Sequence, residues 1–288
     1  MRARFFLFFW LLVATSCKEN SKVLVGDSWS QVRASKKGTL VVTYTDAPKF
    51  SLKEAGKNKG ICFDILEDFK IYLEAKYGID LKIRIIDLSD PYDFSLLLDT
   101  VSKAQGGLIG ASDITITEER RKFLKFSNPY FYNVAILTTQ NDIQNLSELK
   151  NIGKEFAGMK AIAHEGTTNE ERLRKIKSDY YPDLIIEASK GLAEANEKVL
   201  SDSSYFTYLD AAAFFELVEK NLPLKRHPAG DQKGESFGFI MSKNSDWDII
   251  FNEFLSANNG YTNSRSYRKI LSEHLGKQVL NETDSMNQ

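Results

Sequence analysis

The sequence contains few of the residues that build disulfide frameworks and metal centres. It has two cysteines, Cys17 and Cys62, and three scattered histidines. If Cys17 is modified, Cys62 has no partner, so no internal disulfide is expected and Cys62 is predicted to be a small buried hydrophobe. No cysteine pair or histidine cluster supports a zinc site, and we expect neither a metal nor another cofactor.

The sequence also lacks an excess of one charge and any low-complexity block or short internal repeat. Its net charge is −1 and no basic run rises above the background, which disfavours nucleic-acid binding. A hydrophobic content of 42% with 27% charged residues is typical of a globular protein. The 288 residues leave room for one large or two modest domains.

The N-terminus is predicted to be a targeting segment rather than part of the fold. Arg2 and Arg4 precede an apolar run at 5–13, which is too short to span a bilayer comfortably. The small residues that lead to Cys17 resemble a bacterial lipobox, although Ala14 stands where leucine is commonest. This predicts a signal peptide over 1–16, acylation of Cys17 and a polar tether over 17–37. An ordinary signal peptide with an incidental cysteine is the alternative.

Strand and helix patterns alternate from residue 39 onward. The β-branched run at 39–44 is followed by a helical pattern that Gly78 ends, a strand at 81–86, a second helix and an apolar strand at 106–111. Connections too long for hairpins indicate an α/β fold with largely parallel strands. Ligands of such sheets bind beyond the carboxyl ends of strands, where 44–50 and 113–120 both lie.

A second α/β run follows the strand at 131–139. The sequence therefore predicts two lobes: lobe 1 over 38–138 and 234–276, and lobe 2 over 139–233. Two hinge strands near 137–140 and 234–239 are expected to join them. Gly276 is expected to end the last helix, and 277–288 is predicted to be a loose tail.

Arg120 is the most unusual residue of the stretch at 113–120. Thr117 is predicted to be a helix N-cap, with Glu118 and Glu119 in the first turn, so Arg120 falls where a cation opposes the helix dipole. One interpretation is an exposed arginine held by a neighbouring glutamate. The other is an arginine that points into a cleft and grips a carboxylate with its two-pronged guanidinium, with the Thr115 hydroxyl beside it.

The stretches 115–120 (TITEER) and 126–130 (FSNPY) together resemble the signature of the type 3 extracellular solute-binding proteins. These are the periplasmic amino-acid-binding proteins of ABC importers, and the resemblance extends over about 38–276. It implies a two-lobed periplasmic-binding-protein fold of type II, with mostly parallel sheets flanked by helices. It also implies that Thr115 and Arg120 hold the α-carboxylate of the ligand.

The resemblance suggests roles for residues of lobe 2 as well. The turn with Thr167 and Thr168 would contact the same carboxylate, although either threonine could simply cap a helix. Asp210 would pair with the ligand's α-ammonium, with helix capping as its alternative role and Asp202 as the fallback.

Three further residues of lobe 1 have open roles. Asp113 caps a turn, or it adds a second anionic partner for a ligand with an extra cation. Tyr44 and Phe50 are either core aromatics or walls of the ligand's side-chain pocket. His164 in lobe 2 is expected to be a structural hydrogen-bonding group.

The sequence therefore predicts a monomeric, lipid-anchored binding protein of the bacterial cell envelope, without enzymatic activity, that delivers an amino acid or similar small zwitterion to an ABC permease. A dehydratase on the same fold and a ligand-sensing module are the alternatives.

Overall fold

The computed structural model describes residues 25–287. The predicted signal peptide, Cys17 and the first part of the predicted tether lie outside the described residues. The strands are β1 (Val25–Gly26), β2 (Lys37–Tyr44), β3 (Leu52–Glu54), β4 (Lys57–Lys59), β5 (Asp80–Asp87), β6 (Gln105–Gly106), β7 (Leu108–Ala111), β8 (Leu124–Phe126), β9 (Phe131–Gln140), β10 (Lys160–His164), β11 (Ile186–Ser189), β12 (Tyr205–Asp210), β13 (Leu224–Arg226), β14 (Gln232–Phe237) and β15 (Ile240–Ser242). The helices are α1 (Trp29–Ser35), α2 (Ile61–Tyr77), α3 (Phe94–Ser102), α4 (Glu118–Arg121), α5 (Ile152–Glu155), α6 (Thr168–Asp179), α7 (Leu192–Ser201), α8 (Ala211–Glu219), α9 (Trp247–Ser256) and α10 (Arg265–Asn287).

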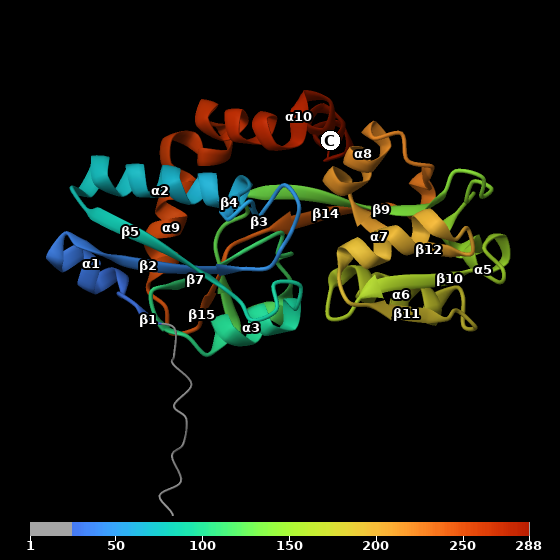
Figure 1. The fold of residues 1–288 in the computed structure, drawn as a ribbon, viewed down its shortest axis with the longest axis horizontal. Coiled ribbons are helices and arrows are strands. Elements are labelled where there is room, and N and C mark those ends of the chain that lie inside the picture. The colour runs from blue at the N-terminus through green and yellow to red at the C-terminus, as the bar shows by residue number, and fades with distance from the viewer. Residues whose placement is uncertain (1–24, 288) are drawn as a thin grey trace, which may run out of the picture.

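Lobe 1 is built on a five-stranded sheet in the order β5-β2-β7-β15-β8 (Figure 1). The pairs β5-β2 and β2-β7 are parallel, whereas β15 runs antiparallel to both of its neighbours. Helices α2, α9 and α10 bury one face of this sheet around Phe69, Trp247 and Phe251. Helix α3 buries the other face. The two covered faces explain why β2 reads as a nearly continuous apolar run.

Lobe 2 contains the sheet β11-β10-β12-β9-β13. Its outer pairs β11-β10 and β10-β12 are parallel, and β9 runs antiparallel to β12 and β13. Helices α5 and α6 pack on one face around Phe156 and Leu173. Helices α7 and α8 contribute to the clusters on the other face. The predicted two-lobed α/β fold is therefore confirmed, with mixed rather than mostly parallel sheets.

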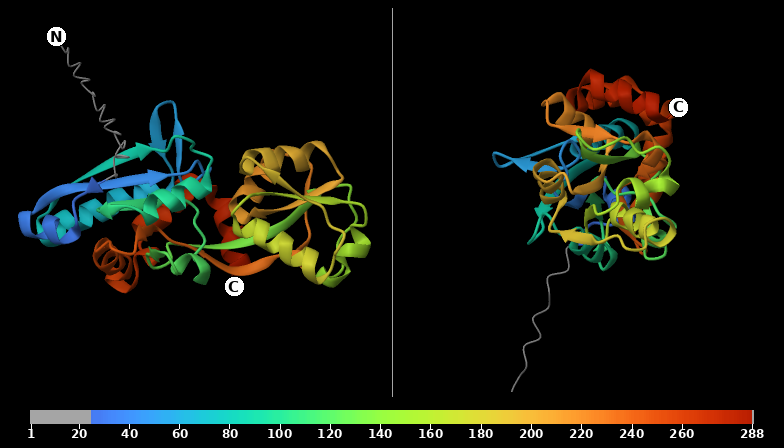
Figure 2. Two further views of the ribbon diagram at one scale, coloured as in Figure 1. Left: turned by 90° about the horizontal axis from the view of Figure 1, so that it is seen from below. Right: turned by 90° about the vertical axis from the view of Figure 1, so that its right-hand side faces the viewer.

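The lobes are joined by β9 and β14, which pair antiparallel as they cross from one lobe to the other (Figure 2). The register brings Phe237 opposite Phe131 and Gln232 opposite Ala135. The crossing on β14 agrees with the hinge expected near 234–239. The hinge expected at 137–140 is wrong, because that part of β9 is already bonded to β12 and β13 inside lobe 2.

The N-terminal segment up to residue 37 is not a simple tether where the structure describes it. Helix α1 lies there, and Trp29 and Val32 are buried in the core of lobe 1. Each such side chain contributes about 1.5–3 kcal/mol when it leaves water, which is enough to dock a short helix. Because the other residues of α1 are mostly polar, the sequence pattern did not predict this docked helix.

The prediction of a loose tail at 277–288 is also wrong for the residues that the structure describes. Gly276 interrupts α10 with a positive φ of 76°, as expected of a helix-ending glycine, but the helix resumes and reaches Asn287. The reason is packing: Val279 is only 2% exposed, and Leu280 packs against the same core. This part of α10 lies against α8 of lobe 2.

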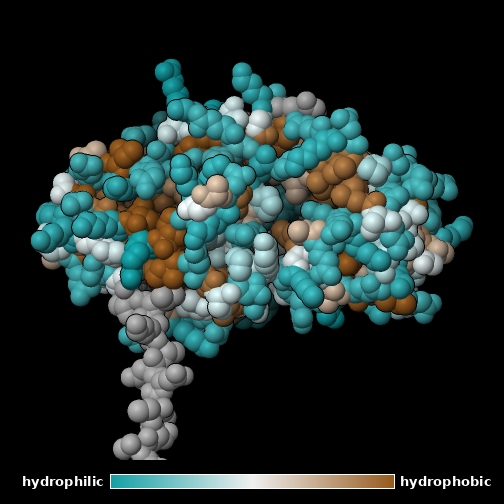
Figure 3. Space-filling model, viewed as in Figure 1, coloured by the Kyte–Doolittle hydropathy of each residue, from teal (hydrophilic) through white to brown (hydrophobic). Residues whose placement is uncertain are grey.

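The surface in the view of Figure 3 is mostly hydrophilic, with hydrophobic side chains gathered on lobe 1 near β5. Among residues 25–287, none of the helices is both long and apolar enough to cross a membrane.

Asp246 provides the first test of the N-terminal docking. Its carboxylate accepts hydrogen bonds from the backbone amides of Trp29 at 2.7 Å and Ser30 at 2.9 Å, the first two residues of α1. Burial acts to raise the pKa of Asp246, but these donors outweigh it and lower the pKa. We expect Asp246→Ala to lower the free energy of unfolding by about 1–2 kcal/mol, as for the loss of a helix cap.

The pH dependence of this effect has a defined sign. A carboxyl group with a lowered pKa in the folded state stabilises the protein above its unfolded pKa, and this stabilisation is lost as the pH falls through the folded pKa. Denaturant titration followed by circular dichroism should therefore show the deficit of Asp246→Ala at neutral pH and its disappearance in acid. The exposed Asp183→Ala variant serves as the control. Equal stabilities of wild type and Asp246→Ala at neutral pH would contradict the assignment.

Candidate functional site

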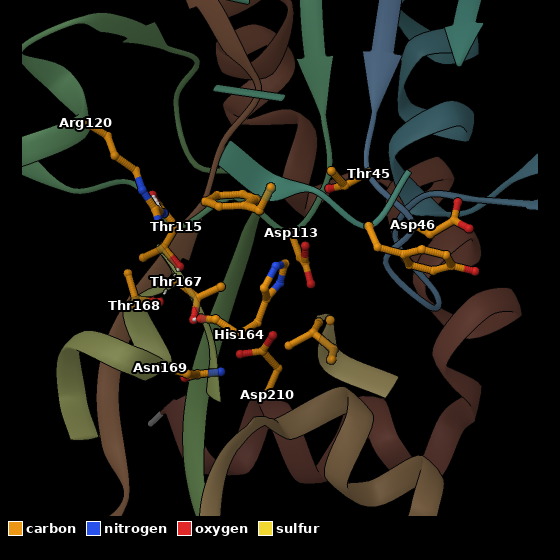
Figure 4. A pocket seen from close by; sticks show the side chains of 14 residues that line it. Thr45, Asp46, Asp113, Thr115, Arg120, His164, Thr167, Thr168, Asn169 and Asp210 are labelled. Atoms are coloured by element: carbon orange, nitrogen blue, oxygen red, sulfur yellow. Dashed lines mark hydrogen bonds between the residues drawn. The ribbon is translucent and has the colours of Figure 1, made fainter. Parts of the chain in front are cut away.

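A cavity lies between the lobes, beyond the carboxyl ends of β2 and β7 and at the start of α6 (Figure 4). The volume of this cavity is about 60 Å³, several times the volume that one water molecule needs. Six of the predicted site residues line it: Asp113, Thr115, Arg120, Thr167, Thr168 and Asp210. The residues that sequence reasoning did not assign to the site are Thr45, Asp46, Tyr92, Phe94, His164, Asn169, Gly191 and Leu192.

Arg120 points into this cavity and is only 5% exposed. Thr117 caps α4 by accepting a hydrogen bond from the Arg120 backbone amide, as predicted. The glutamates of the first turn pair with Arg121 and Lys122 instead, so the alternative of an exposed arginine held by Glu118 or Glu119 is wrong.

The Arg120 guanidinium is held by neutral groups. It donates to the carbonyl oxygens of Thr115 at 2.9 Å and Gly166 at 3.2 Å, and it lies 4.8 Å from the centre of the Phe94 ring. Burial lowers the pKa of Arg120 from its ordinary value, although it remains a cation at neutral pH. A buried guanidinium held by carbonyls and a ring retains unneutralised charge and donors for an anion.

The turn before α6 supplies the second lobe's polar groups. Gly166 adopts a positive φ of 75°, and Thr167 caps the helix by accepting from the Glu170 amide. Of the two threonines, Thr167 is therefore the one that caps the helix. Thr168 is thus released from capping, and its hydroxyl lies 3.3 Å from that of Thr115 across the two lobes.

Asp210 does not use its side chain to cap α8, although it occupies the N-cap position. Instead Asn133 accepts from the Ala211 amide and donates to the Asp210 carboxylate at 2.7 Å. Figure 4 shows Asp113 and Asp210 directed into the space beside His164. Asp202, the fallback, binds Ser204 and does not line the cavity.

Among the described residues, no lysine or arginine forms an ion pair with Asp113 or Asp210. Burial raises the pKa of Asp210 well above its usual value, and the charges of Glu235 and Asp113 add to the effect. Burial likewise raises the pKa of Asp113, against the hydrogen bond from Ser112. Both groups would therefore be stabilised by an incoming cation.

Glu235, on the crossing strand β14, is the main residue that sequence reasoning missed. It is 7% exposed, and one of its oxygens accepts from Thr115 at 2.7 Å and Thr168 at 3.0 Å. Arg172 pairs with the same oxygen at 2.6 Å. Burial acts to raise the pKa of Glu235, but Arg172 and these hydrogen bonds outweigh it and lower the pKa. The pair is therefore charged on both sides.

Tyr44 and Phe50 do not line the cavity, so the structure does not place them with the other predicted site residues. Tyr44 is 2% exposed and donates to Asn58 and Asp87. Phe50, also 2% exposed, packs edge-on against Phe131 and Phe237. Each side chain fills the core below the strand ends rather than the space above them.

Other side chains form the apolar wall and the far end of the cavity. Tyr92 and Phe94 contribute aromatic rings to its lining, and Asp46 lines it as well. One Asp46 oxygen is buried without a hydrogen-bond partner among the described residues, and burial raises the pKa of this carboxyl. Its position directly after β2 was the available sequence signal. His164 also faces the cavity, and burial lowers the pKa of its ring.

The site thus combines a buried guanidinium, hydroxyl groups from both lobes and three carboxylates. This set can bind a molecule that carries both an anionic and a cationic group. Within residues 25–287, no three histidine, cysteine, aspartate or glutamate side chains are placed to hold a metal.

Comparison with known proteins matches residues 40–277 to the family model of bacterial extracellular solute-binding proteins, family 3. The chain is 26% identical over 191 residues to a membrane-bound lytic murein transglycosylase F of Sodalis glossinidius, which covers 65% of this chain but only 37% of that protein. The chain thus spans little more than a third of this curated relative.

Two further proteins are matched over most of their length. A probable ABC transporter extracellular-binding protein of Bacillus subtilis, YckB, is 24% identical over 217 residues, or 74% of this chain and 71% of that protein. The arginine-, lysine-, histidine-binding protein ArtJ of Geobacillus stearothermophilus has a similar structure, with a TM-score of 0.64 at 22% identity over 83% of this chain and 96% of that one.

Proposed function

The chain belongs to the bacterial extracellular solute-binding proteins, family 3, and we propose that it captures an α-amino acid between its two lobes for an ABC importer. The observation that carries this proposal is the opposition of charges in one cavity. Arg120 offers a fork for a carboxylate, and Asp210 and Asp113 offer acceptors for an ammonium group. A zwitterion leaves water at low cost only where both of its charges find such partners.

The groups that would bind the ligand come from both lobes, so binding through all of them requires the lobes to close. Arg120 and Thr115 come from lobe 1, whereas Thr168 and Asp210 come from lobe 2. The N-terminus of α6 faces the same cavity, and a helix N-terminus favours an anion there. A ligand that binds all of them stabilises the closed arrangement over an open one.

The balance of charge favours a ligand with a cationic side chain. Among the lining residues, Asp46, Asp113 and Asp210 face the single guanidinium of Arg120. A neutral zwitterion adds one charge of each sign and leaves two carboxylates without a cation. A second positive group on the ligand reduces that number to one, which lowers the cost of burial. The description of ArtJ as an arginine-, lysine-, histidine-binding protein supports this choice.

The family of the chain and its N-terminal sequence both support a role in delivering the ligand to an ABC permease. The binding-protein description of YckB supports an ABC permease as partner. The apolar run at 5–13 and the small residues before Cys17 support export and acylation. A lipid anchor would hold the protein at the extracytoplasmic side of a membrane of the bacterial cell envelope.

A thermal-shift screen of the purified protein against the twenty common amino acids and L-citrulline tests this proposal. L-Citrulline matches L-arginine in shape but carries a neutral urea group. At a ligand concentration of about 100 times Kd, binding adds about 2.7 kcal/mol of stability, which raises the melting temperature by roughly 5–10 °C. We expect this with L-arginine or L-lysine and a much smaller rise with L-citrulline.

Two outcomes of the screen are distinct. An absence of any shift across all the amino acids would reject the capture of an amino acid. Equal shifts with L-arginine and L-citrulline would reject only the cationic side chain.

A further inference from the structure

Glu235 lies where the two lobes and the two crossing strands meet. It sits on β14 opposite Asn133 of β9, and it is almost fully buried. Neither the proposed carboxylate contact nor the proposed ammonium contact uses it. A buried carboxylate at such a place needs partners, and the structure shows which ones it takes.

The contacts of Glu235 are those expected for the ligand's own carboxylate. Its Oε1 atom accepts from the hydroxyls of Thr115 at 2.7 Å and Thr168 at 3.0 Å. A threonine hydroxyl has a single hydrogen, so both hydrogens are engaged by this one oxygen. In this arrangement the two hydroxyls present only lone pairs to a second carboxylate.

Arg172 of lobe 2 balances the negative charge of Glu235. Arg172 lies one helical turn after Thr168 on α6, and its Nη2 atom is 2.6 Å from the same Oε1 atom. The second carboxylate oxygen, Oε2, accepts from Asn133 at 2.9 Å, and Asn133 donates in turn to Asp210. Glu235 therefore keeps two partners if the threonine hydroxyls turn away.

We propose that Glu235 is an internal carboxylate that competes with the ligand's carboxylate for the hydroxyls of Thr115 and Thr168 and thereby sets the affinity of the site. This role rests on the proposed function. When a ligand carboxylate reaches Arg120, the two hydroxyls rotate toward it, and Glu235 remains bound to Arg172 and Asn133. The competition weakens binding of the ligand, and Arg172 limits that penalty by neutralising Glu235.

This competition predicts that substitutions of Glu235 and Arg172 change the affinity for the ligand in opposite directions. Glu235→Gln removes the rival charge, weakens the rival acceptor and frees Arg172 to attract the ligand. Arg172→Gln leaves a buried carboxylate uncompensated next to the ligand's carboxylate. Because each change alters charge-assisted contacts in the buried site, we expect about tenfold tighter binding in the first variant and about tenfold weaker binding in the second. A merely structural pair would weaken binding in both.

Isothermal titration calorimetry on the full protein provides the test, with L-arginine or, if another amino acid gives the largest melting shift, with that amino acid. The matched controls are Glu187→Gln, which removes a lobe 2 glutamate that pairs with Lys160, and Arg174→Gln, on the exposed side of α6. The double variant should bind close to the wild type, since the two effects are coupled.

The outcomes separate this inference from the proposed function. Binding by Glu235→Gln that is no tighter than that of the wild type, or binding by Arg172→Gln that is no weaker, overturns the role of Glu235 while leaving amino-acid capture intact. Absence of binding by any amino acid to the wild type rejects both.

Discussion

Arg120→Ala is expected to abolish the ligand-dependent rise in melting temperature and to weaken binding more than a hundredfold. The guanidinium is buried, its protein partners are carbonyls and a ring, and it faces the cavity. Two charge-assisted hydrogen bonds to a carboxylate contribute roughly 3–6 kcal/mol, and a factor of ten in affinity corresponds to about 1.4 kcal/mol. The measurement is calorimetry on both proteins with the best ligand of the screen.

Two further variants make this result interpretable. Arg121→Ala removes the neighbouring arginine, which is exposed and pairs with Glu118, and it should bind like the wild type. Arg120→Lys keeps the charge but loses the planar fork, so its affinity should fall between the other two. Retention of the full melting shift by Arg120→Ala would remove the anchor on which the carboxylate site depends.

Asp210→Asn is expected to have two effects of opposite sign: the ligand-free protein becomes more stable, and ligand binding weakens about 10- to 100-fold. The binding loss follows because an ammonium group would exchange a carboxylate for a neutral amide oxygen. The Asn133 donor remains satisfied, because the new side chain keeps an oxygen at the same place. The two measurements are the melting temperature without ligand and calorimetry with ligand.

The sign of the stability effect follows from the pKa. Burial raises the pKa of Asp210, so its contribution to stability is present in acid and is lost as the pH rises through the raised value. Asn does not ionise, so the ligand-free variant should melt above the wild type at neutral pH, with a difference that shrinks on acidification. Asp202→Asn, at an aspartate that bonds to Ser204 and Lys198 and lies outside the cavity, is the control. A ligand-free variant that melts below the wild type at neutral pH would contradict this account of the charge.

Much of the fold could be predicted because local signals agree with tertiary packing in its longest elements. The run at 39–44 and the alternation of strands and helices both reappear in β2 and its neighbours. Arg120 could be found because a cation at a helix start, after two acids, is locally disfavoured. An arginine at a position where a cation destabilises the helix was therefore the sequence signal.

The remaining features depend on contacts between distant parts of the chain. Glu235 is 120 residues from Thr115 and 67 from Thr168, and no local pattern marks a glutamate on a strand as a buried partner of both. The roles of Tyr44 and Phe50 stayed open because a sequence pattern does not give the depth at which a ring packs beneath the end of a strand. Helix α1 was not predicted because only two of its seven residues, Trp29 and Val32, are buried.

The position of β15 in lobe 1 constrains how the chain assembles. This strand comes after the whole of lobe 2 in the sequence, yet it lies between β7 and β8. During synthesis from the N-terminus, β7 and β8 therefore present open edges until residues 240–242 have emerged. Lobe 2 has all of its central strands by Arg226, so it can complete its sheet first. Export in an unfolded form and folding after translocation would spare lobe 1 a long period with those edges unprotected inside the cell.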